Sequence, residues 1–374
     1  MTTAERTRPA RSPGVPTAGT LVGWRGLVFT VCLLGIAAKA AAEVPDRAFV
    51  QHVEQRIVSG DYVGLIVGVI DGGETTVASY GRTSKDGPAE RPNDRTLFEI
   101  SSVVKTFAAT LLARAVTEGR VTLGDAANTY LEPEARLASF EGREITLLDL
   151  VAHQSGLPYM PESIEPVGEL NPYAATTRAE LLTAINAFTP TSSPGQGYSY
   201  SAFAYGILAL VLERVYDADF ASLVERQITT PLGMADTVLS PGPDQSRRLA
   251  AGYTPTGEPA VPFEQGVFRP AGSMYSTLHD LMIWVRANMS PESSPFGDAL
   301  RLSQQMHNKL GTIGLAWHKS EQHDDRSQYG TANGYRAYVG FLADGSKGVV
   351  ILANTIADAE ALGSHLLTGT ALTE

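Results

Sequence analysis

Strand-like segments occur only near the two ends of this 374-residue chain, and helical segments fill its middle, which restricts the folds available to it. Near each end, two β-branched apolar runs flank a turn, Gly72–Gly73 in the first case and Asp344–Gly345 in the second. The four runs cover residues 63–70, 75–80, 335–341 and 348–353. Two hairpins separated by helices predict one antiparallel sheet built from both ends of the chain.

In most of the remaining chain, apolar residues recur with the spacing that is typical of helices. A helix over 46–58 has apolar residues spaced four apart and ends before Gly60, and a last helix covers 357–367. Between the hairpins the predicted helices cover 103–116, 147–152, 178–187, 204–215 and 220–227. We therefore predict an α/β (α+β) fold, in which N- and C-terminal helices flank an antiparallel sheet and a mostly helical lobe is inserted. The cleft between the lobes is the expected site.

Residues 1–42 have the pattern of a secretory signal peptide. Four arginines precede an apolar run from Leu27 to Ala38, and small residues follow it. Cleavage is predicted after Ala40 or Ala42. The alternative is an uncleaved membrane anchor, but the apolar run is short for a full span. We expect an exported protein, periplasmic or secreted, with no stable membrane anchor after cleavage.

The mature chain is predicted to be one domain over 43–374. Its sheet lobe covers about 43–95 and 260–374, and its helical lobe covers about 96–259. The single cysteine, Cys32, falls in the apolar run, so the mature chain would lack disulfides. The net charge of −11 gives no electrostatic footprint for nucleic acid. Because the histidines lack metal-ligand spacing, we predict no metal, and we expect no other cofactor.

The chemistry of the chain is indicated most strongly by Ser102 and Lys105, which form S-x-x-K at the start of the predicted helix over 103–116. Three residues are just under one helical turn, so both side chains project to the same side. A serine needs a base to become a nucleophile, and a lysine can be that base if burial lowers its pKa. The alternative is a helix cap at Ser101 or Ser102 with a solvated Lys105.

The surrounding segments resemble those of class C β-lactamases, penicillin-binding proteins acting as D-Ala-D-Ala peptidases, and related esterases. Residues 98–107 are similar to the F-x-I-G-S-x-[ST]-K-x-[FM] block of that superfamily. Other segments follow in the family's order, namely 119–131, 145–158, 231–234, 250–253 and 271–277. The resemblance implies a serine hydrolase with Ser102 as nucleophile and Lys105 as its activating partner. It also implies a structural role for His153 and Ser155, which could otherwise form a catalytic pair.

The family's second motif, Tyr-x-Asn, aligns with residues 194–208. Tyr200 falls on the catalytic tyrosine, which implies that it passes a proton to the leaving group. Ala202 falls on the asparagine that holds the lysine and the substrate amide in the family. Because alanine has no side-chain donor or acceptor, this departure weakens the prediction of β-lactam turnover.

The third motif, Lys-Thr-Gly or His-x-Gly on an edge strand, aligns with Gln328, Tyr329 and Gly330. The resemblance implies substrate contacts at Gln328, Gly330 and Ala202. It implies an oxyanion hole made by the main-chain N–H groups of Ser102 and Thr331. Gln328 can donate a hydrogen bond but carries no charge, so a substrate carboxylate would lose a charge-assisted contact.

Three hypotheses for function follow. The first is a hydrolase that forms an acyl-enzyme on Ser102 from β-lactams, D-amino-acid peptides or esters, with a small molecule or a peptidoglycan peptide as substrate. The second is a narrower esterase or acyltransferase, which Ala202 and Gln328 favour. The third is a ligand-binding protein that keeps the fold without turnover.

Overall fold

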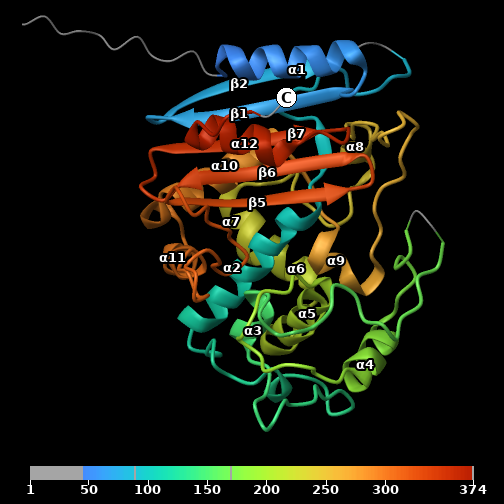
Figure 1. The fold of residues 1–374 in the computed structure, drawn as a ribbon, viewed down its shortest axis with the longest axis vertical. Coiled ribbons are helices and arrows are strands. Elements are labelled where there is room, and N and C mark those ends of the chain that lie inside the picture. Colours follow the sequence, from blue (N-terminus) through green and yellow to red (C-terminus); the bar gives the residue numbers. More distant parts are fainter. Residues whose placement is uncertain (1–44, 88–89, 169–170, 373–374) are drawn as a thin grey trace, which may run out of the picture. The chain divides into compact units, whose positions relative to one another are not determined.

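The sheet joins the two ends of the chain, as the sequence predicts (Figure 1). The computed structural model describes residues 45–87, 90–168 and 171–372, so the predicted signal peptide, Cys32 and both cleavage positions lie outside the described residues. Five antiparallel strands lie in the order β2-β1-β7-β6-β5. They are β1 (Gly64–Asp71), β2 (Glu74–Gly81), β5 (Asp325–Ala332), β6 (Tyr335–Leu342) and β7 (Lys347–Ala353).

Pairing between β1 and β7 links the N-terminal hairpin to the C-terminal strands. Leu65 lies opposite Ala353, and the register continues to Asp71 opposite Lys347. Because side chains alternate across a strand, this register gives each face of the sheet its own apolar set. Ile66 and Ile70 face one core, and Leu65, Val67 and Val69 face the other.

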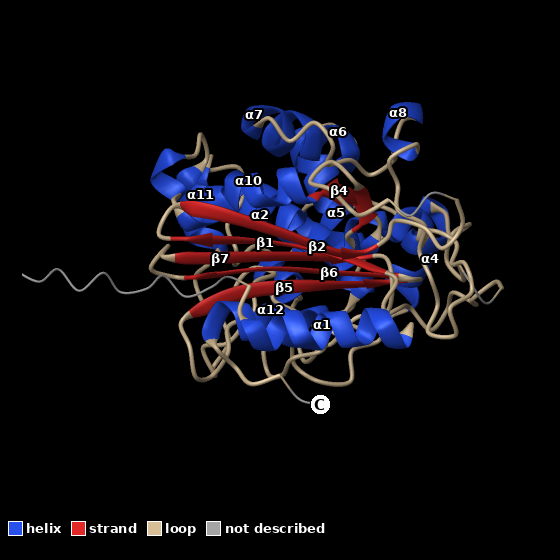
Figure 2. Cartoon of the chain, turned by 90° about the horizontal axis from the view of Figure 1, so that it is seen from above, coloured by secondary structure: helices blue, strands red, loops and turns tan. Residues whose placement is uncertain are grey.

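Helices cover both faces of the sheet (Figure 2). Helices α1 (Arg47–Ser59) and α12 (Ala359–Thr368) lie on one face, where Phe49 and Leu362 join the smaller core. Asp46 caps the start of α1, and Gly60 ends it in the left-handed conformation that glycine tolerates. Helix α10 (Leu278–Met289) lies on the opposite face, and its Leu278, Leu281, Trp284 and Val285 belong to the larger core.

The helical part of the chain is arranged around α2 (Val104–Thr117), whose residues are buried along nearly its whole length. A short pair of strands, β3 (Leu97–Glu99) and β4 (Tyr275–Thr277), lies beside the start of this helix. The other helices are α3 (Leu147–Val151), α4 (Arg178–Ala187), α5 (Ala202–Tyr216), α6 (Phe220–Val224), α7 (Thr230–Leu232), α8 (Pro243–Ser246), α9 (Arg269–Gly272) and α11 (Gly297–Ser303).

The helices differ from the sequence prediction in several places, and the short helices α7, α8, α9 and α11 were not predicted. The predicted helix over 220–227 is α-helical only to Val224 and then widens into a π-helix over Glu225–Thr229. Helix α10 was not predicted, although its apolar residues recur with helical spacing. The described residues form one compact unit, and no helix among them is long and apolar enough to cross a membrane. The proposed division into a sheet lobe and a helical lobe stays a prediction.

Strand β5 is an edge strand, and its free edge meets the turn before α2 at very short range. A Cβ atom at Gly330 would lie 2.0 Å from the Ile100 carbonyl oxygen, which is far inside van der Waals contact. The glycine therefore lets the backbone of the strand approach the segment that carries Ser102. This approach determines where the two main chains lie relative to each other.

We predict that Gly330→Ala lowers the free energy of unfolding by about 1–3 kcal/mol, because the added methyl group must push β5 away from Ile100. Urea denaturation measures the change. The matched control is Gly124→Ala, where the nearest atom to the new methyl lies 3.9 Å away. Equal stability of the two variants would show that the close approach is not required.

Candidate active site

The segment that carries Ser102 is a short 3-10 turn, Ser101–Val103, that leads directly into α2. Ser101 has φ +44°, in the left-handed region, where the family pattern has glycine. Its Oγ donates a hydrogen bond of 2.7 Å to the Thr331 carbonyl oxygen, which ties the turn to β5. The bend leaves Ser102 half-buried at the N-terminal end of the helix.

Lys105 lies one turn further along and is 1% exposed. Its Nζ donates to Ser102 Oγ at 3.1 Å and to the Ala271 carbonyl oxygen. Among the described residues no carboxylate forms an ion pair with it. Burial without a counter-ion lowers the pKa of Lys105 to about 7. A neutral amine that can accept a proton is therefore available near neutral pH.

Tyr200 reaches the same serine from the other side. Its hydroxyl donates to Ser102 Oγ at 2.7 Å, and the Lys105 Nζ lies 4.7 Å from the centroid of its ring. Burial raises the pKa of Tyr200 to about 12, and the hydrogen bond to Ser102 offsets part of that increase. The phenol is thus protonated in the resting site, as a proton donor must be.

Tyr200 is held from behind by His153, which is buried and adopts φ +57°. The two ring centroids are 4.4 Å apart, and His153 Nδ1 accepts a hydrogen bond of 3.1 Å from the Ser201 main-chain N–H. Burial lowers the pKa of His153 well below its usual value, so the ring is neutral. Ser155 is also buried, and its Oγ accepts from the Leu157 N–H at 3.4 Å. These contacts fit the structural role that the resemblance implies for this segment.

The main chain at Thr331 faces the nucleophile. Its carbonyl oxygen accepts from Ser101 rather than from the neighbouring strand. In an antiparallel strand the N–H and C=O of one residue point to the same side, so the Thr331 N–H also lies on the free edge of β5. The Thr331 N–H and the Ser102 N–H therefore belong to the two segments that meet at the nucleophile. Their action as an oxyanion hole stays a prediction.

The other two predicted substrate contacts are buried. The Gln328 side chain donates to the Ala316 carbonyl oxygen at 2.8 Å and accepts from the Tyr329 N–H at 3.0 Å, so the fold already engages its amide. Ala202 is 1% exposed at the first position of α5, and its N–H donates to the Tyr159 carbonyl oxygen at 2.9 Å. Neither side chain offers the cleft a free polar group in this conformation.

Two polar residues near Ser102 carry no motif that would have identified them. Glu99, in β3, is fully buried, and burial raises its pKa to about 8, so it adds little negative charge near neutral pH. His318 lies next to β5, where its Nε2 is 3.2 Å from the Tyr198 hydroxyl. Burial, followed by the charge of Lys105, lowers the pKa of His318 to about 4. Glu99 lies three residues before Ser102 in the sequence, whereas His318 is connected with the site only by its contacts in space.

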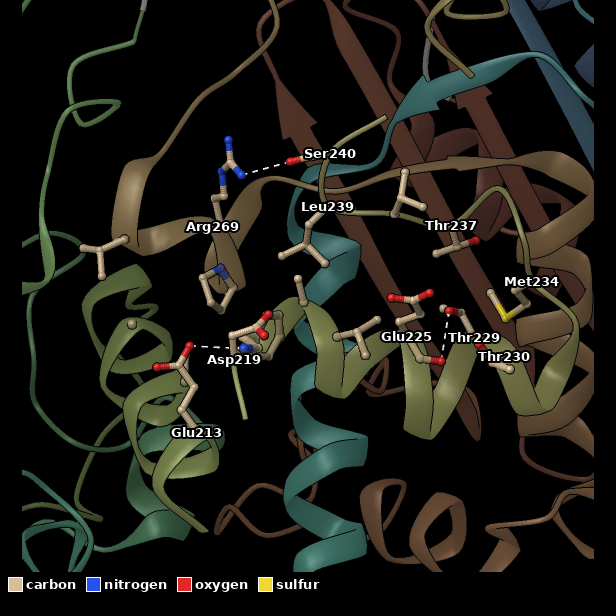
Figure 3. A pocket seen from close by; sticks show the side chains of 18 of the residues that line it. Glu213, Asp219, Glu225, Thr229, Thr230, Met234, Thr237, Leu239, Ser240 and Arg269 are labelled. Atoms are coloured by element: carbon tan, nitrogen blue, oxygen red, sulfur yellow. Dashed lines mark hydrogen bonds between the residues drawn. The ribbon is translucent and has the colours of Figure 1, made fainter. Parts of the chain in front are cut away.

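A separate cavity of about 700 Å³ lies between α5, α6 and the segment before β4 (Figure 3). Its lining contains none of the residues around Ser102. Its polar groups have partners: Arg269 donates to Ser240 and Glu264, and Glu213 accepts from the Phe220 N–H and from Arg178. Within the described ranges, no group of three or more His, Cys, Asp or Glu side chains could hold a metal ion.

Comparison with known proteins identifies the family of the chain. The sequence profile described as Beta-lactamase matches residues 47–365. The D-alanyl-D-alanine-carboxypeptidase/endopeptidase AmpH of Escherichia coli K12 is 29% identical over 281 residues, which cover 72% of this chain and 70% of that protein. A β-lactamase of Pseudomonas fluorescens is 28% identical, with 81% of this chain and 91% of the relative covered.

The solved structures confirm the predicted fold class. The β-lactamase/D-alanine carboxypeptidase from Pseudomonas syringae superposes with a TM-score of 0.74 at 24% identity, and the match covers 87% of this chain and 99% of that one. Fold and site together define a serine hydrolase. The chain belongs to the β-lactamase family.

We predict that the acylation rate falls as the pH drops below about 7, because Lys105 then gains the proton that prevents it from acting as a base. Lys105→Arg keeps the positive charge but cannot lose its proton in this range. Acylation by the variant should fall by a factor of about 10²–10⁴, the usual contribution of a general base. Stopped-flow acylation measured against pH tests both statements.

Lys309→Arg is the matched control, since Lys309 is exposed and, within the described ranges, its side chain bonds only Gln196. It should acylate at the wild-type rate. A Lys105→Arg enzyme within about tenfold of wild type would be too active for Lys105 to be the base. The proton would then have to leave through Tyr200.

Proposed function

We propose that this chain is an exported hydrolase that cleaves β-lactams, D-amino-acid peptides or esters through an acyl-enzyme on Ser102. The observation that carries the proposal is the convergence of two groups on one oxygen. Lys105 Nζ lies 3.1 Å and the Tyr200 hydroxyl 2.7 Å from Ser102 Oγ. One of these groups titrates near neutral pH and the other stays protonated, which is the pairing that acid–base catalysis requires.

The proposed first half of the reaction forms the acyl-enzyme. Neutral Lys105 takes the proton of Ser102 as Oγ attacks the carbonyl carbon, and the N–H groups of Ser102 and Thr331 hold the oxyanion. The carbon–leaving group bond breaks as Tyr200 gives its proton to the leaving atom. The Lys105 ammonium, over the Tyr200 ring, returns a proton to that phenolate.

The second half of the reaction reverses these roles with water as nucleophile. Water loses a proton to the neutral Lys105 amine, and its oxygen bonds to the acyl carbon. The bond from that carbon to Ser102 Oγ then breaks, and Ser102 recovers a proton from the Lys105 ammonium through Tyr200. No step requires a metal or an organic cofactor, because Lys105 and Tyr200 carry every proton.

A narrower esterase or acyltransferase is a second candidate. It is favoured by the buried amide of Gln328, which already bonds Ala316 and Tyr329, and by the methyl group of Ala202. A site without a cation at these two positions gives a substrate carboxylate no charge-assisted hydrogen bond there, and such bonds are about twice as strong as neutral ones. A panel of β-lactams, D-Ala-D-Ala peptides and nitrophenyl esters distinguishes the two candidates.

We predict that Ser102→Ala lowers turnover of every hydrolysed substrate in that panel by a factor on the order of 10³ or more, because no acyl-enzyme can form. Covalent labelling by a fluorescent phosphonate should also disappear. Ser155→Ala serves as the control, because that buried serine is bonded within its own loop. Labelling of Ser102→Ala at the wild-type rate would show that another residue is the nucleophile.

Export is supported by the basic, apolar and small-residue order of residues 1–42. We predict that the protein recovered from the periplasm or the medium begins at Ala41 or Glu43, which intact-mass measurement determines. Replacing Leu33 and Leu34 with arginine should keep the full-length protein inside the cell, because a charged apolar run cannot act as a signal. A full-length exported protein would contradict the predicted cleavage.

A further inference from the structure

The segment that precedes β5 brings a histidine to the edge of the proposed active site. His318 pairs with Ser327 in β5 through two main-chain hydrogen bonds, each 2.9 Å long. This pairing adds a short strand only along the first half of the β5 edge. The second half, from Tyr329 to Ala332, remains opposite the turn that carries Ser102, where Ser101 bonds Thr331.

The His318 ring lies between the two segments that carry the proposed catalytic groups. Its Nε2 is 3.2 Å from the hydroxyl of Tyr198, which lies two residues before Tyr200. Its centroid is 6.3 Å from that of Tyr329, which lies two residues before Thr331. The ring is also close enough to Lys105 for that charge to lower the pKa of His318. The two ring contacts place the imidazole between the segments that carry Tyr200 and Thr331.

The contact with Tyr198 uses only one of the two ring nitrogens of His318, so the other can bond another partner. When the Tyr198 hydroxyl donates to Nε2, the proton of the neutral imidazole is on Nδ1, which becomes a donor. No residue in the described part of the chain forms a hydrogen bond with Nδ1. Because the pKa of His318 is about 4, the ring is uncharged near neutral pH and suits a neutral acceptor better than a carboxylate.

The surroundings of this donor are aromatic. Tyr159, Tyr198 and Tyr329 are 52%, 49% and 40% exposed, so parts of all three rings are open to a ligand. Tyr159 stacks on Tyr200 with centroids 6.3 Å apart, and Tyr198 and Tyr329 flank His318. Exposed tyrosines around a hydrogen-bond donor suit a ligand with a flat or apolar group next to a carbonyl.

We infer that His318 is a substrate-contacting residue, whose ring donates a hydrogen bond to a neutral carbonyl oxygen located beyond the scissile bond. The inference rests on the proposed function, because it assumes that Ser102 is acylated. It names a substrate class: neutral acyl compounds with a second carbonyl, such as N-acylated amino-acid esters or amides. In this active site His318 supplies a polar contact that the engaged amide of Gln328 does not supply.

The experiment compares two activated esters on the full mature enzyme. The nitrophenyl ester of N-acetylglycine carries a second carbonyl, and nitrophenyl butyrate lacks it. His318→Phe keeps an aromatic ring and removes the donor. We expect its kcat/KM for the N-acetylglycine ester to fall about three- to tenfold, the value of one net hydrogen bond, mainly through a higher KM. The value for the butyrate should stay within about twofold, because that ester lacks the acceptor.

Two further variants make the test specific. Tyr198→Phe should also reduce the ratio of kcat/KM for the N-acetylglycine ester to kcat/KM for the butyrate. In the double variant this ratio should fall by less than the product of the two single reductions, since both residues act through one hydrogen-bonded pair. The control is His52→Phe, which alters a histidine of α1 that packs against Tyr62. It should leave kcat/KM for both esters unchanged. Thermal melts confirm that each variant is folded.

The outcomes separate this inference from the proposed function. If a phosphonate does not label Ser102 in the wild-type enzyme, the proposed function is wrong and the inference fails with it. If Ser102 is labelled and His318→Phe leaves the ratio of the two esters unchanged, only the inference fails. An equal loss of kcat/KM for both esters also overturns the inference, because His318 would then support the structure of the site rather than bind the second carbonyl.

Discussion

The proposed chemistry of this protein depends on burying the Lys105 amine without a counter-ion. Lys105 is enclosed by α2, α9 and two tyrosine rings, and its polar contacts are the Ser102 hydroxyl and one main-chain carbonyl. Desolvation of this kind costs free energy in the charged state, so the folded protein favours the neutral amine. The fold therefore gives up some stability to bury this amine, and the closely packed α2 and the two apolar cores compensate for that cost.

The order of helices and strands could be predicted because local pattern and tertiary structure agree at the ends of the chain. Gly72–Gly73 and Asp344–Gly345 mark turns, and β-branched runs flank them, so the strands of both hairpins appear where they were expected. The widening at Glu225–Thr229 could not be predicted, because a π-helix has the same local composition as an α-helix. The fold class is confirmed by solved structures of class C β-lactamases.

The active site was predictable only where a motif is continuous in sequence. Ser102 and Lys105 are three residues apart, so their proximity follows from helical geometry. Tyr200 could be aligned but not positioned, because its contact with Ser102 spans 98 residues. His318 had no signal at all, since its place beside Tyr198 results from a strand pairing with Ser327 that leaves no trace in composition. Gln328 could be aligned, but the orientation of its amide could not be predicted, because it depends on a hydrogen bond to the Ala316 carbonyl oxygen.

The pairing of β1 with β7 also has a consequence for synthesis of the chain. The first hairpin cannot join the rest of the sheet until the strand at the opposite end of the chain exists, and contacts so distant in sequence form slowly. During translation one edge of β1 therefore stays unpaired until β7 has been made. The five-stranded sheet can therefore close only after Lys347–Ala353, the strand that joins the two hairpins, has been synthesised.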